Sequence, residues 1–308
     1  MPVIHNSTFL VDKNHKLRVR YTPELAQYFD LDFSREKSGY VPTNMLLPLI
    51  QRIIHVNEEY SLIMLDIHGH LWSLVHKELT KLSSPQAKNI IVHKGRYGGR
   101  KRTFMFLLDH NGNLHRGEIR RGDLQSISLK IVARDVAFIT IYDGLLIRAY
   151  NNGIVDYHCN NIQLSVPIKL LDCDIVVSEN GELISFDVGR LCDPKLHKYL
   201  KNECVSNVIE HPLGKIVDLI HNSDRCLDNA IILDDKGCAG NLDYTTVDTG
   251  SLQYKTYEFT PLDDDIAKHG PFLSLAKIDG TMHLEGKDGI YYSYAVGIPQ
   301  RIPFKLKA

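Results

Sequence analysis

The stretch LIMLDIHGHLWSL, residues 62–74, decides the fold. An apolar run ends in Asp66, two residues lead to Gly69, and a shorter strand-like segment follows. The stretch FMFLLDHNGNLHRGE, residues 104–118, repeats the same order of features. A glycine just after an apolar run supplies the positive φ that a tight hairpin turn requires. Each stretch therefore predicts a β-hairpin, and the recurrence predicts a repeated structural unit.

The same pattern occurs seven times. The six intervals between residues 15 and 280 average about 44 residues, although single intervals range from 28 to 56. A period near 44 is typical of four-stranded propeller blades. Four of the seven turns contain Asn-Gly or Asp-Gly, the strongest short-range hairpin pattern. The seven turns lie at His15, Gly69, Gly112, Gly153, Gly181, Gly237 and Gly280.

A further apolar strand precedes most of these hairpins, at 47–56, 88–94, 165–172 and 213–221. The C-terminal segment Ile302–Leu306 resembles Val166–Leu170, yet no hairpin follows it. The first hairpin, Thr8–Tyr21, has no such strand before it. We therefore expect the C-terminal strand to complete the N-terminal blade and close a ring, which removes exposed sheet edges.

The predicted fold is all-β: one domain over residues 1–308, forming a single closed β-propeller. Seven blades fit the seven turns, and six blades are the alternative because the spacing is irregular. Two insertions, 22–47 and 193–210, are expected to contain short helices. In the first, Thr22 caps and Pro23 begins a helix through Phe29, and the aromatic residues beside it favour a cluster that closes a blade edge over a partner-binding loop. In the second, Asp193 caps a helix whose apolar residues recur at helical spacing as far as Val208.

Composition narrows the class of protein. The chain has 308 residues, with 36 Lys and Arg against 37 Asp and Glu, so no overall field favours nucleic acid or an anionic membrane. Its six cysteines form no C-x-x-C pair, which is typical of reduced thiols. No secretory leader and no apolar run of membrane-spanning length is present. We therefore expect a cytoplasmic protein without a membrane span.

The order of strand, short link, apolar strand, D-x-x-G and strand resembles the regulator of chromosome condensation type of seven-bladed β-propeller. Residues 53–74, IIHVNEEYSLIMLDIHGHLWSL, match that family's blade pattern best. The glycine-rich segment that usually follows in that family is missing here, so no functional residue is carried over. The resemblance implies a ring that presents loops to a macromolecular partner, in some cases a small GTPase, with a role like that of a guanine-nucleotide exchange factor.

A basic segment is the strongest functional indication in the sequence. HKGRYGGRKR, residues 93–102, is followed by HRGEIRRGD, residues 115–123, and a correctly placed hairpin brings both onto one blade. Such a surface can grip phosphate or pair with an acidic protein surface, and we place the acidic protein ahead of nucleic acid. The structural alternative is a solvated loop. The predicted partner-binding residues are Lys94, Arg96, Arg100, Lys101, Arg102, Arg116, Arg120 and Arg121.

Residues for catalysis or cofactor binding are not evident. The chain contains no H-E-x-x-H, no G-x-S-x-G and no phosphate-binding glycine loop, so we assign no catalytic residue, no metal ligand and no cofactor. The sequence favours a protein-interaction module or scaffold. One alternative is a hydrolase or lactonase that uses the carboxylates of 262–265 and 233–235 at a channel mouth. The other is a structural component of a larger assembly.

Overall fold

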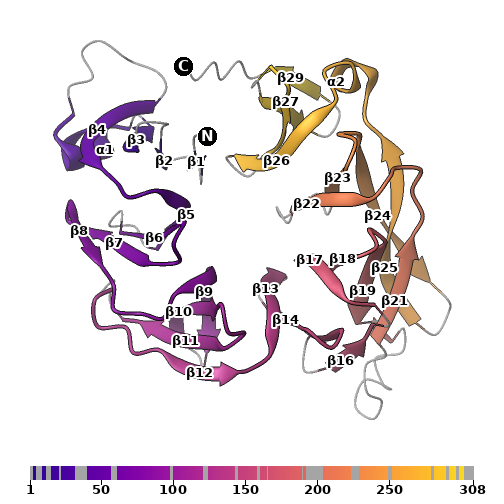
Figure 1. Cartoon of the computed structure of the whole chain (residues 1–308), viewed down its shortest axis with the longest axis horizontal. Coiled ribbons are helices and arrows are strands. Elements are labelled where there is room, and N and C mark those ends of the chain that lie inside the picture. The colour runs from indigo at the N-terminus through magenta and orange to yellow at the C-terminus, as the bar shows by residue number, and fades with distance from the viewer. Residues whose placement is uncertain are drawn as a thin grey trace. The chain divides into compact units, whose positions relative to one another are not determined.

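The computed structural model describes residues 3–4, 9–11, 15–20, 22–31, 40–56, 61–97, 100–120, 124–142, 145–157, 160–164, 166–188, 190–191, 204–222, 229–248, 252–278, 281–288, 291–295 and 298–301. The chain divides into two compact units. Unit 1 comprises residues 1–135 and unit 2 residues 136–308. Nearly all of the described elements are β-strands, as the sequence predicts (Figure 1).

Unit 1 consists of three four-stranded antiparallel sheets and one short helix (Figure 1). Sheet 1 contains β1 (Val3–Ile4), β2 (Phe9–Val11), β3 (Lys16–Arg20) and β4 (Tyr40–Leu46), with α1 (Pro23–Phe29) between β3 and β4. Sheet 2 contains β5 (Ile50–His55), β6 (Leu62–Asp66), β7 (Leu71–Val75) and β8 (Glu78–Lys81). Sheet 3 contains β9 (Ala87–Tyr97), β10 (Arg100–Asp109), β11 (Leu114–Ile119) and β12 (Lys130–Ala133).

Unit 2 consists of four further sheets, described in chain order. Sheet 4 contains β13 (Val136–Tyr142), β14 (Leu145–Tyr150), β15 (Ile154–Tyr157) and β16 (Asn160–Gln163). Sheet 5 contains β17 (Ile168–Asp172), β18 (Ile175–Ser178), β19 (Leu183–Val188) and β21 (Cys204–Ile209). Sheet 6 contains β22 (Ile216–Asn222), β23 (Asn229–Asp234), β24 (Ala239–Asp248) and β25 (Leu252–Pro261), and β20 (Arg190–Leu191) adds a fifth strand to its edge. Sheet 7 contains β26 (Phe272–Ile278), β27 (Thr281–Gly286), β28 (Tyr291–Ala295) and β29 (Ile298–Arg301), and α2 (Asp264–Ala267) precedes it.

The β-propeller fold class is confirmed. Successive segments of the chain form antiparallel sheets with their strands in sequence order, and six predicted turns adopt a positive φ between the second and third strands of a sheet. The six turns are centred on His15, Gly69, Gly112, Gly153, Gly181 and Gly237. The strands expected before four of the hairpins are β5, β9, β17 and β22. The count of seven blades in one ring stays a prediction, with six as its alternative.

The first and last sheets differ from the expectation. Val3 and Ile4 form β1 and pair with Val11 and Leu10 of β2, so the first hairpin does have a strand before it. That strand takes the place beside β2 that we expected the C-terminal strand to occupy, and Ile302–Leu306 lies outside the described residues. The hairpin expected at Gly280 joins β26 to β27, the first and second strands of sheet 7, because Ile278 pairs with Thr281.

The first insertion agrees with its predicted helix. Helix α1 begins at Pro23 and ends at Phe29, and the N–H of Leu25 donates to Oγ1 of Thr22 at 3.2 Å. Phe29 is buried and packs edge-on against Phe9 with ring centroids 6.4 Å apart. The helix therefore seals the core between sheets 1 and 2, which supports the predicted aromatic cluster.

The second insertion corrects the sequence interpretation. Cys204–Ile209, expected as the end of a helix, is strand β21 and pairs with β19. The alternation of exposed Val208 with buried Ile209 suits a strand with one buried face. Pairing with β19 outweighs the helical spacing here, because local periodicity is a weaker constraint than a complete ladder of hydrogen bonds. The residues from Asp193 to Glu203 lie outside the described part of the chain.

The Asp-x-x-Gly turn is held by a buried carboxylate. Oδ1 of Asp66 accepts the N–H groups of His68 at 2.9 Å and His70 at 2.8 Å, and Oδ2 accepts the indole N–H of Trp72 at 3.0 Å. Asp66 is only 3 % exposed. Its carboxylate thus satisfies backbone donors that the turn would otherwise leave unpaired in a buried position.

The same arrangement recurs in other sheets. Oδ1 of Asp109 accepts the N–H groups two and four residues later at 2.9 and 2.8 Å, and Oδ1 of Asp234 does so at 3.0 and 2.7 Å. In sheet 5 a serine replaces the aspartate, and Oγ of Ser178 accepts the N–H of Glu182 at 3.0 Å. The recurrence that the sequence shows is therefore a recurrence of one hydrogen-bonding device.

The hydrophobic core consists of clusters between neighbouring sheets. In unit 1, one cluster lies between sheets 1 and 2 and another between sheets 2 and 3. In unit 2, three clusters lie between sheets 4 and 5, 5 and 6, and 6 and 7. The central strands β6, β18 and β23 are buried on both faces, which is why their sequences are continuous apolar runs rather than alternating patterns.

We expect Asp234→Ala to lower the free energy of unfolding by about 3 kcal/mol, because three N–H groups lose a buried acceptor. These are the N–H groups of Lys236, Cys238 and Gly214. Asp235→Ala is the matched control, since Asp235 is the exposed neighbour in the same turn, and its change should stay within about 0.5 kcal/mol. Chemical denaturation of both variants measures the difference. Equal losses would show that the buried carboxylate does not hold the turn.

Candidate functional site

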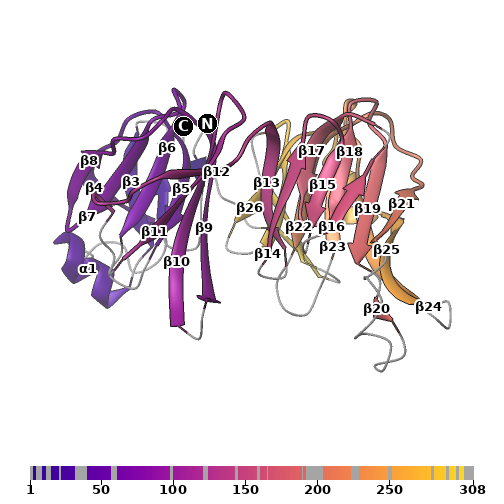
Figure 2. The same ribbon diagram turned by 90° about the horizontal axis from the view of Figure 1, so that it is seen from below.

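The predicted basic residues lie on sheet 3 of unit 1. Lys94 and Arg96 are in β9, three more are in β10, Arg116 is in β11, and Arg120 follows β11 directly. The strands β9 and β10 are 11 and 10 residues long and form a long hairpin that ends between Tyr97 and Arg100 (Figure 2). The prediction that one blade carries these residues is thus supported by their position in the strands. Arg121 lies outside the described residues.

The pairing of β9 with β10 places like charges opposite each other. Lys101 pairs directly with Arg96, and Lys94 lies two positions further along the same ladder, opposite Thr103. Arg102 follows Lys101 and pairs with Gly95. Directly opposed like charges destabilise an antiparallel pair. This end of the hairpin therefore keeps a concentration of positive charge that does not help the sheet to form.

One carboxylate compensates part of this charge. Glu118 lies 3.7 Å from Arg102 and 3.4 Å from Arg120, measured between the charged nitrogen and oxygen atoms. Arg116 instead stacks over the ring of Phe104, with its guanidinium carbon 5.3 Å from the ring centroid. Lys94, Arg102, Arg116 and Arg120 are all exposed. The site is an exposed, positively charged sheet end, suited to an anionic surface rather than to a buried small molecule.

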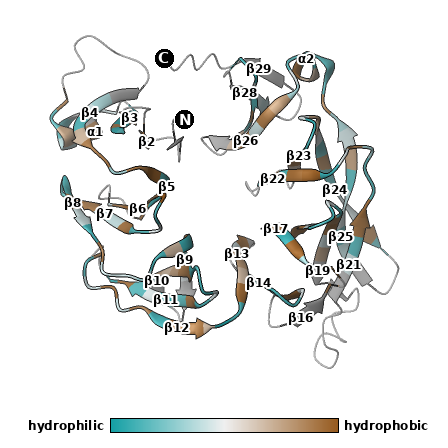
Figure 3. Ribbon diagram, viewed as in Figure 1, coloured by the Kyte–Doolittle hydropathy of each residue, from teal (hydrophilic) through white to brown (hydrophobic). Residues whose placement is uncertain are grey.

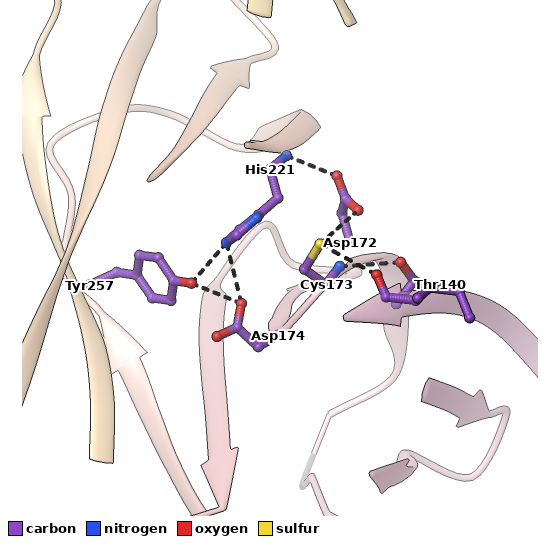
Figure 4. Close-up of polar contacts among 7 residues, drawn as sticks. Thr140, Asp172, Cys173, Asp174, His221 and Tyr257 are labelled. Carbon is purple, nitrogen blue, oxygen red and sulfur yellow. Dashed lines mark hydrogen bonds and ion pairs between the residues drawn. The ribbon is translucent and has the colours of Figure 1, made fainter. Parts of the chain in front are cut away.

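A second group of polar side chains lies inside unit 2 (Figure 4). The hydroxyl of Tyr257 donates to Oδ1 of Asp174 at 2.8 Å and lies 2.9 Å from Nε2 of His221. Because the Tyr257 proton goes to Asp174, its oxygen accepts from His221, which places the histidine proton on Nε2. The three residues are 1 to 4 % exposed. They form a buried histidine–tyrosine–aspartate cluster.

The buried cluster belongs to a chain of contacts between the first strands of neighbouring sheets (Figure 4). The N–H of Cys173 donates to Oγ1 of Thr140 at 3.3 Å, which connects sheet 5 to sheet 4. The N–H of His221 donates to Oδ2 of Asp172 at 2.8 Å, which connects sheet 6 to sheet 5. A similar bond connects sheet 7 to sheet 6, where the N–H of Leu275 donates to Oδ2 of Asp218 at 3.1 Å.

These contacts give the cluster a structural role. His221 and Tyr257 have almost no accessible surface for a substrate, since they are 2 % and 4 % exposed. No motif spacing in the sequence links the members of the cluster, because Asp174 and Tyr257 are 83 residues apart. Only the packing of sheets 5 and 6 brings them together.

The carboxylates proposed for a hydrolase have other roles in the described structure. Asp234 holds the turn of sheet 6 through its three N–H donors. Asp264 and Asp265 begin helix α2, and Asp265 forms an ion pair with Lys268 at 2.5 Å. Among the described residues no group of three or more His, Cys, Asp or Glu side chains is arranged to hold a metal ion.

Burial raises the pKa of Asp218 above its ordinary value of 3.8. The N–H groups of Leu275 and Leu219 and the positive charge of Lys169 offset part of this effect. Asp66 and Asp109 behave in the opposite way. Burial alone would raise the pKa of each carboxyl, but the hydrogen bonds that it accepts in its turn outweigh burial, so each pKa lies below 3.8.

No protein-family model and no curated protein sequence matches the chain. Solved structures do match its fold. BBS1N in complex with ARL6DN aligns with a TM-score of 0.51 at 12% sequence identity, over 91% of this chain and 84% of that chain. Yeast RCC1 (Prp20) bound to Kap60 aligns with a TM-score of 0.44 at 11% identity, over 95% of this chain and 69% of that one. BamB from Moraxella catarrhalis aligns with a TM-score of 0.48 at 12% identity, over 93% and 80% of the two chains.

The likeness to BBS1N is one of fold, because 12% identity carries no correspondence of individual residues. It agrees with the propeller class that the sequence predicts. Within the described residues, neither helix has the length or the apolar character needed to cross a membrane.

We expect Tyr257→Phe to lower the free energy of unfolding by about 1–3 kcal/mol, because the change removes a buried hydroxyl that serves both His221 and Asp174. Tyr254→Phe is the matched control on the same strand, at a partly exposed position, and should change stability by less than about 0.5 kcal/mol. Thermal and chemical unfolding measure both. A cluster that does not join sheets 5 and 6 would leave the two variants equally stable.

The raised pKa of Asp218 predicts a pH dependence of stability. Between the ordinary carboxyl pKa and the raised one, the folded protein binds a proton that the unfolded chain does not bind. The stabilisation from this group is therefore complete below the ordinary value of 3.8 and is lost as pH rises through the raised pKa. Unfolding of the wild type and of Asp218→Asn, compared from about pH 4 to about pH 7, should show the wild type losing stability relative to the variant. A difference that stays constant across this range would contradict the prediction.

Proposed function

We propose that this chain is a protein-interaction propeller whose basic hairpin, residues 94–102 of β9 and β10, binds an acidic surface on a partner protein. The observation that carries the proposal is the like-charge pairing of Lys101 with Arg96 at the end of this hairpin. Such a pair costs stability in the free protein, and an anionic partner relieves that cost on binding.

The charge balance of the strands supports an anionic partner. Across β9, β10 and β11, the exposed end of the sheet carries one carboxylate, Glu118, which already pairs with Arg102 and Arg120. The whole chain has a formal net charge of −1, so the positive charge is local. A local patch on a nearly neutral protein suits a discrete acidic surface better than a long polyanion such as nucleic acid.

A small GTPase is the partner class that we propose. The likeness in fold to BBS1N, which was solved in complex with ARL6DN, supports a propeller as a platform for such a partner. The basic hairpin supplies the contact, and the helix and aromatic cluster at the first insertion stay part of the core of unit 1. Binding of this kind requires no catalytic residue on the propeller.

We expect the triple variant Arg100→Glu, Lys101→Glu and Arg102→Glu to bind its partner at least about tenfold more weakly, because charge repulsion replaces attraction. The measurement is affinity capture from cytosol, followed by binding assays with purified small GTPases loaded with GDP or with a non-hydrolysable GTP analogue. The matched control is Lys130→Glu with Arg134→Glu, which reverses two charges at or beside β12 on the same sheet. The control should retain the partner, and binding of the wild type should weaken as salt increases.

Two results would contradict the proposal. A partner that the triple variant retains would place the contact elsewhere on the chain. Capture that disappears after nuclease treatment would identify nucleic acid as the bound polyanion and exclude the acidic protein surface.

A further inference from the structure

Three large apolar side chains are exposed together in unit 1. Leu46 at the end of β4 is 68 % exposed, Leu49 in the link to β5 is 43 % exposed, and Ile67 in the turn between β6 and β7 is 55 % exposed. The N–H of Ile67 donates to the carbonyl of Leu49 at 2.9 Å, so these two residues are direct neighbours. Leu46 is only three residues before Leu49. We call this surface the Leu46–Leu49–Ile67 patch.

The fold does not require apolar residues at these positions. Ile67 follows Asp66 in the Asp-x-x-Gly turn, and the residue at this place in the other turns is polar and exposed. Those residues are His110, Asn151, Glu179 and Asp235. The bond from Ile67 to Leu49 also recurs, from Glu179 to Pro167 at 3.1 Å and from Asp235 to Lys215 at 2.9 Å. The same backbone geometry is thus built elsewhere with charged side chains facing water.

An exposed isoleucine and leucine at such positions lose the favourable burial that apolar side chains gain from a partner. Exposed apolar groups that the fold does not need, gathered on one surface, mark interaction sites more often than scattered single residues do. The patch therefore fits a protein partner that covers it.

The charges around the patch define the chemistry of that partner. Lys16 lies directly opposite Leu46 in the pairing of β3 with β4. Arg52, exposed three residues after Leu49, donates to the side chain of Asn89. Lys88 is exposed and follows Ala87, whose N–H donates to the carbonyl of Gly69 at 2.7 Å. The carboxylate of Asp66 is buried within its turn, so the rim described by these residues is positive.

We propose that the Leu46–Leu49–Ile67 patch is a docking site for a short segment of a partner protein that carries apolar side chains flanked by acidic residues. The apolar side chains cover the patch, and the acidic residues face Lys16, Arg52 and Lys88. Separated apolar anchors with charged flanks give such contacts both affinity and orientation.

This docking site is distinct from the basic hairpin. Strand β9 begins at Ala87, beside the turn at Gly69, and ends at Tyr97, where the basic hairpin closes. The ten steps between these residues correspond to roughly 33 Å along a strand. The two surfaces therefore lie at opposite ends of the same strand, and each can be tested without altering the other.

The experiment is selection of a random 12-residue peptide library, displayed on phage, against the full chain. Each round is counter-selected against Ile67→Asp. We expect the enriched peptides to carry two or three apolar residues flanked by Asp or Glu. Fluorescence anisotropy of a synthetic enriched peptide should then show binding at least about tenfold weaker to Ile67→Asp and several-fold weaker to Lys16→Glu.

Two control variants show whether the peptide binds the patch itself. Leu273 in unit 2 is also 55 % exposed, so Leu273→Asp makes the same kind of chemical change outside the patch and should bind the peptide like the wild type. The triple variant of the basic hairpin should also bind the peptide normally, which keeps this result independent of the proposed partner of that hairpin. Circular dichroism and unfolding midpoints establish that all of the variants are folded.

Three outcomes overturn the proposal. Failure to enrich any peptide over the Ile67→Asp variant would show that the patch is not a docking site for such a segment. Enriched peptides without acidic flanks, or with basic ones, would refute the assigned chemistry. Self-association of the wild type in sedimentation velocity, abolished by Ile67→Asp, would identify the patch as an interface between two copies of the chain.

Discussion

The buried carboxylate at the end of the second strand is the constraint on which the sheets depend. Asp66, Asp109 and Asp234 each accept two backbone N–H groups of the turn that follows, and Ser178 fulfils part of the same role in sheet 5. A turn of this kind reverses the chain at the same point in each sheet and starts the third strand in register. The apolar strands can then bury both faces, because their ends carry no unpaired donors.

The same geometry is independent of what the turn displays. Figure 3 shows that polar and apolar residues alternate around sheets of the same architecture. In sheet 2 the turn presents Ile67 to water, and in sheet 6 the equivalent residue is Asp235. Once the backbone is held by hydrogen bonds, the exposed positions are released from folding constraints and can serve binding.

Polar contacts also connect one sheet to the next within unit 2. Thr140, Asp172 and Asp218 each accept an N–H group from the following sheet. The cluster of His221, Tyr257 and Asp174 reinforces the contact between sheets 5 and 6. These bonds add direction to interfaces that are otherwise apolar, since apolar burial alone does not fix how two sheets are aligned.

The sequence alone determined the elements whose information is local. Hairpin turns follow from glycine at positive φ, helix α1 follows from Thr22 and Pro23, and the basic residues of sheet 3 follow from their position along one predicted hairpin. Only the tertiary structure decided features that depend on distant pairing: Cys204–Ile209 became a strand because β19 was available as its partner, and β1 took the place beside β2. The buried cluster and the Leu46–Leu49–Ile67 patch also depend on long-range contacts, because residues far apart in the chain meet only when sheets pack and turns bond to neighbouring links. Periodicity reports one chain segment at a time, whereas such contacts are a property of the assembled sheets.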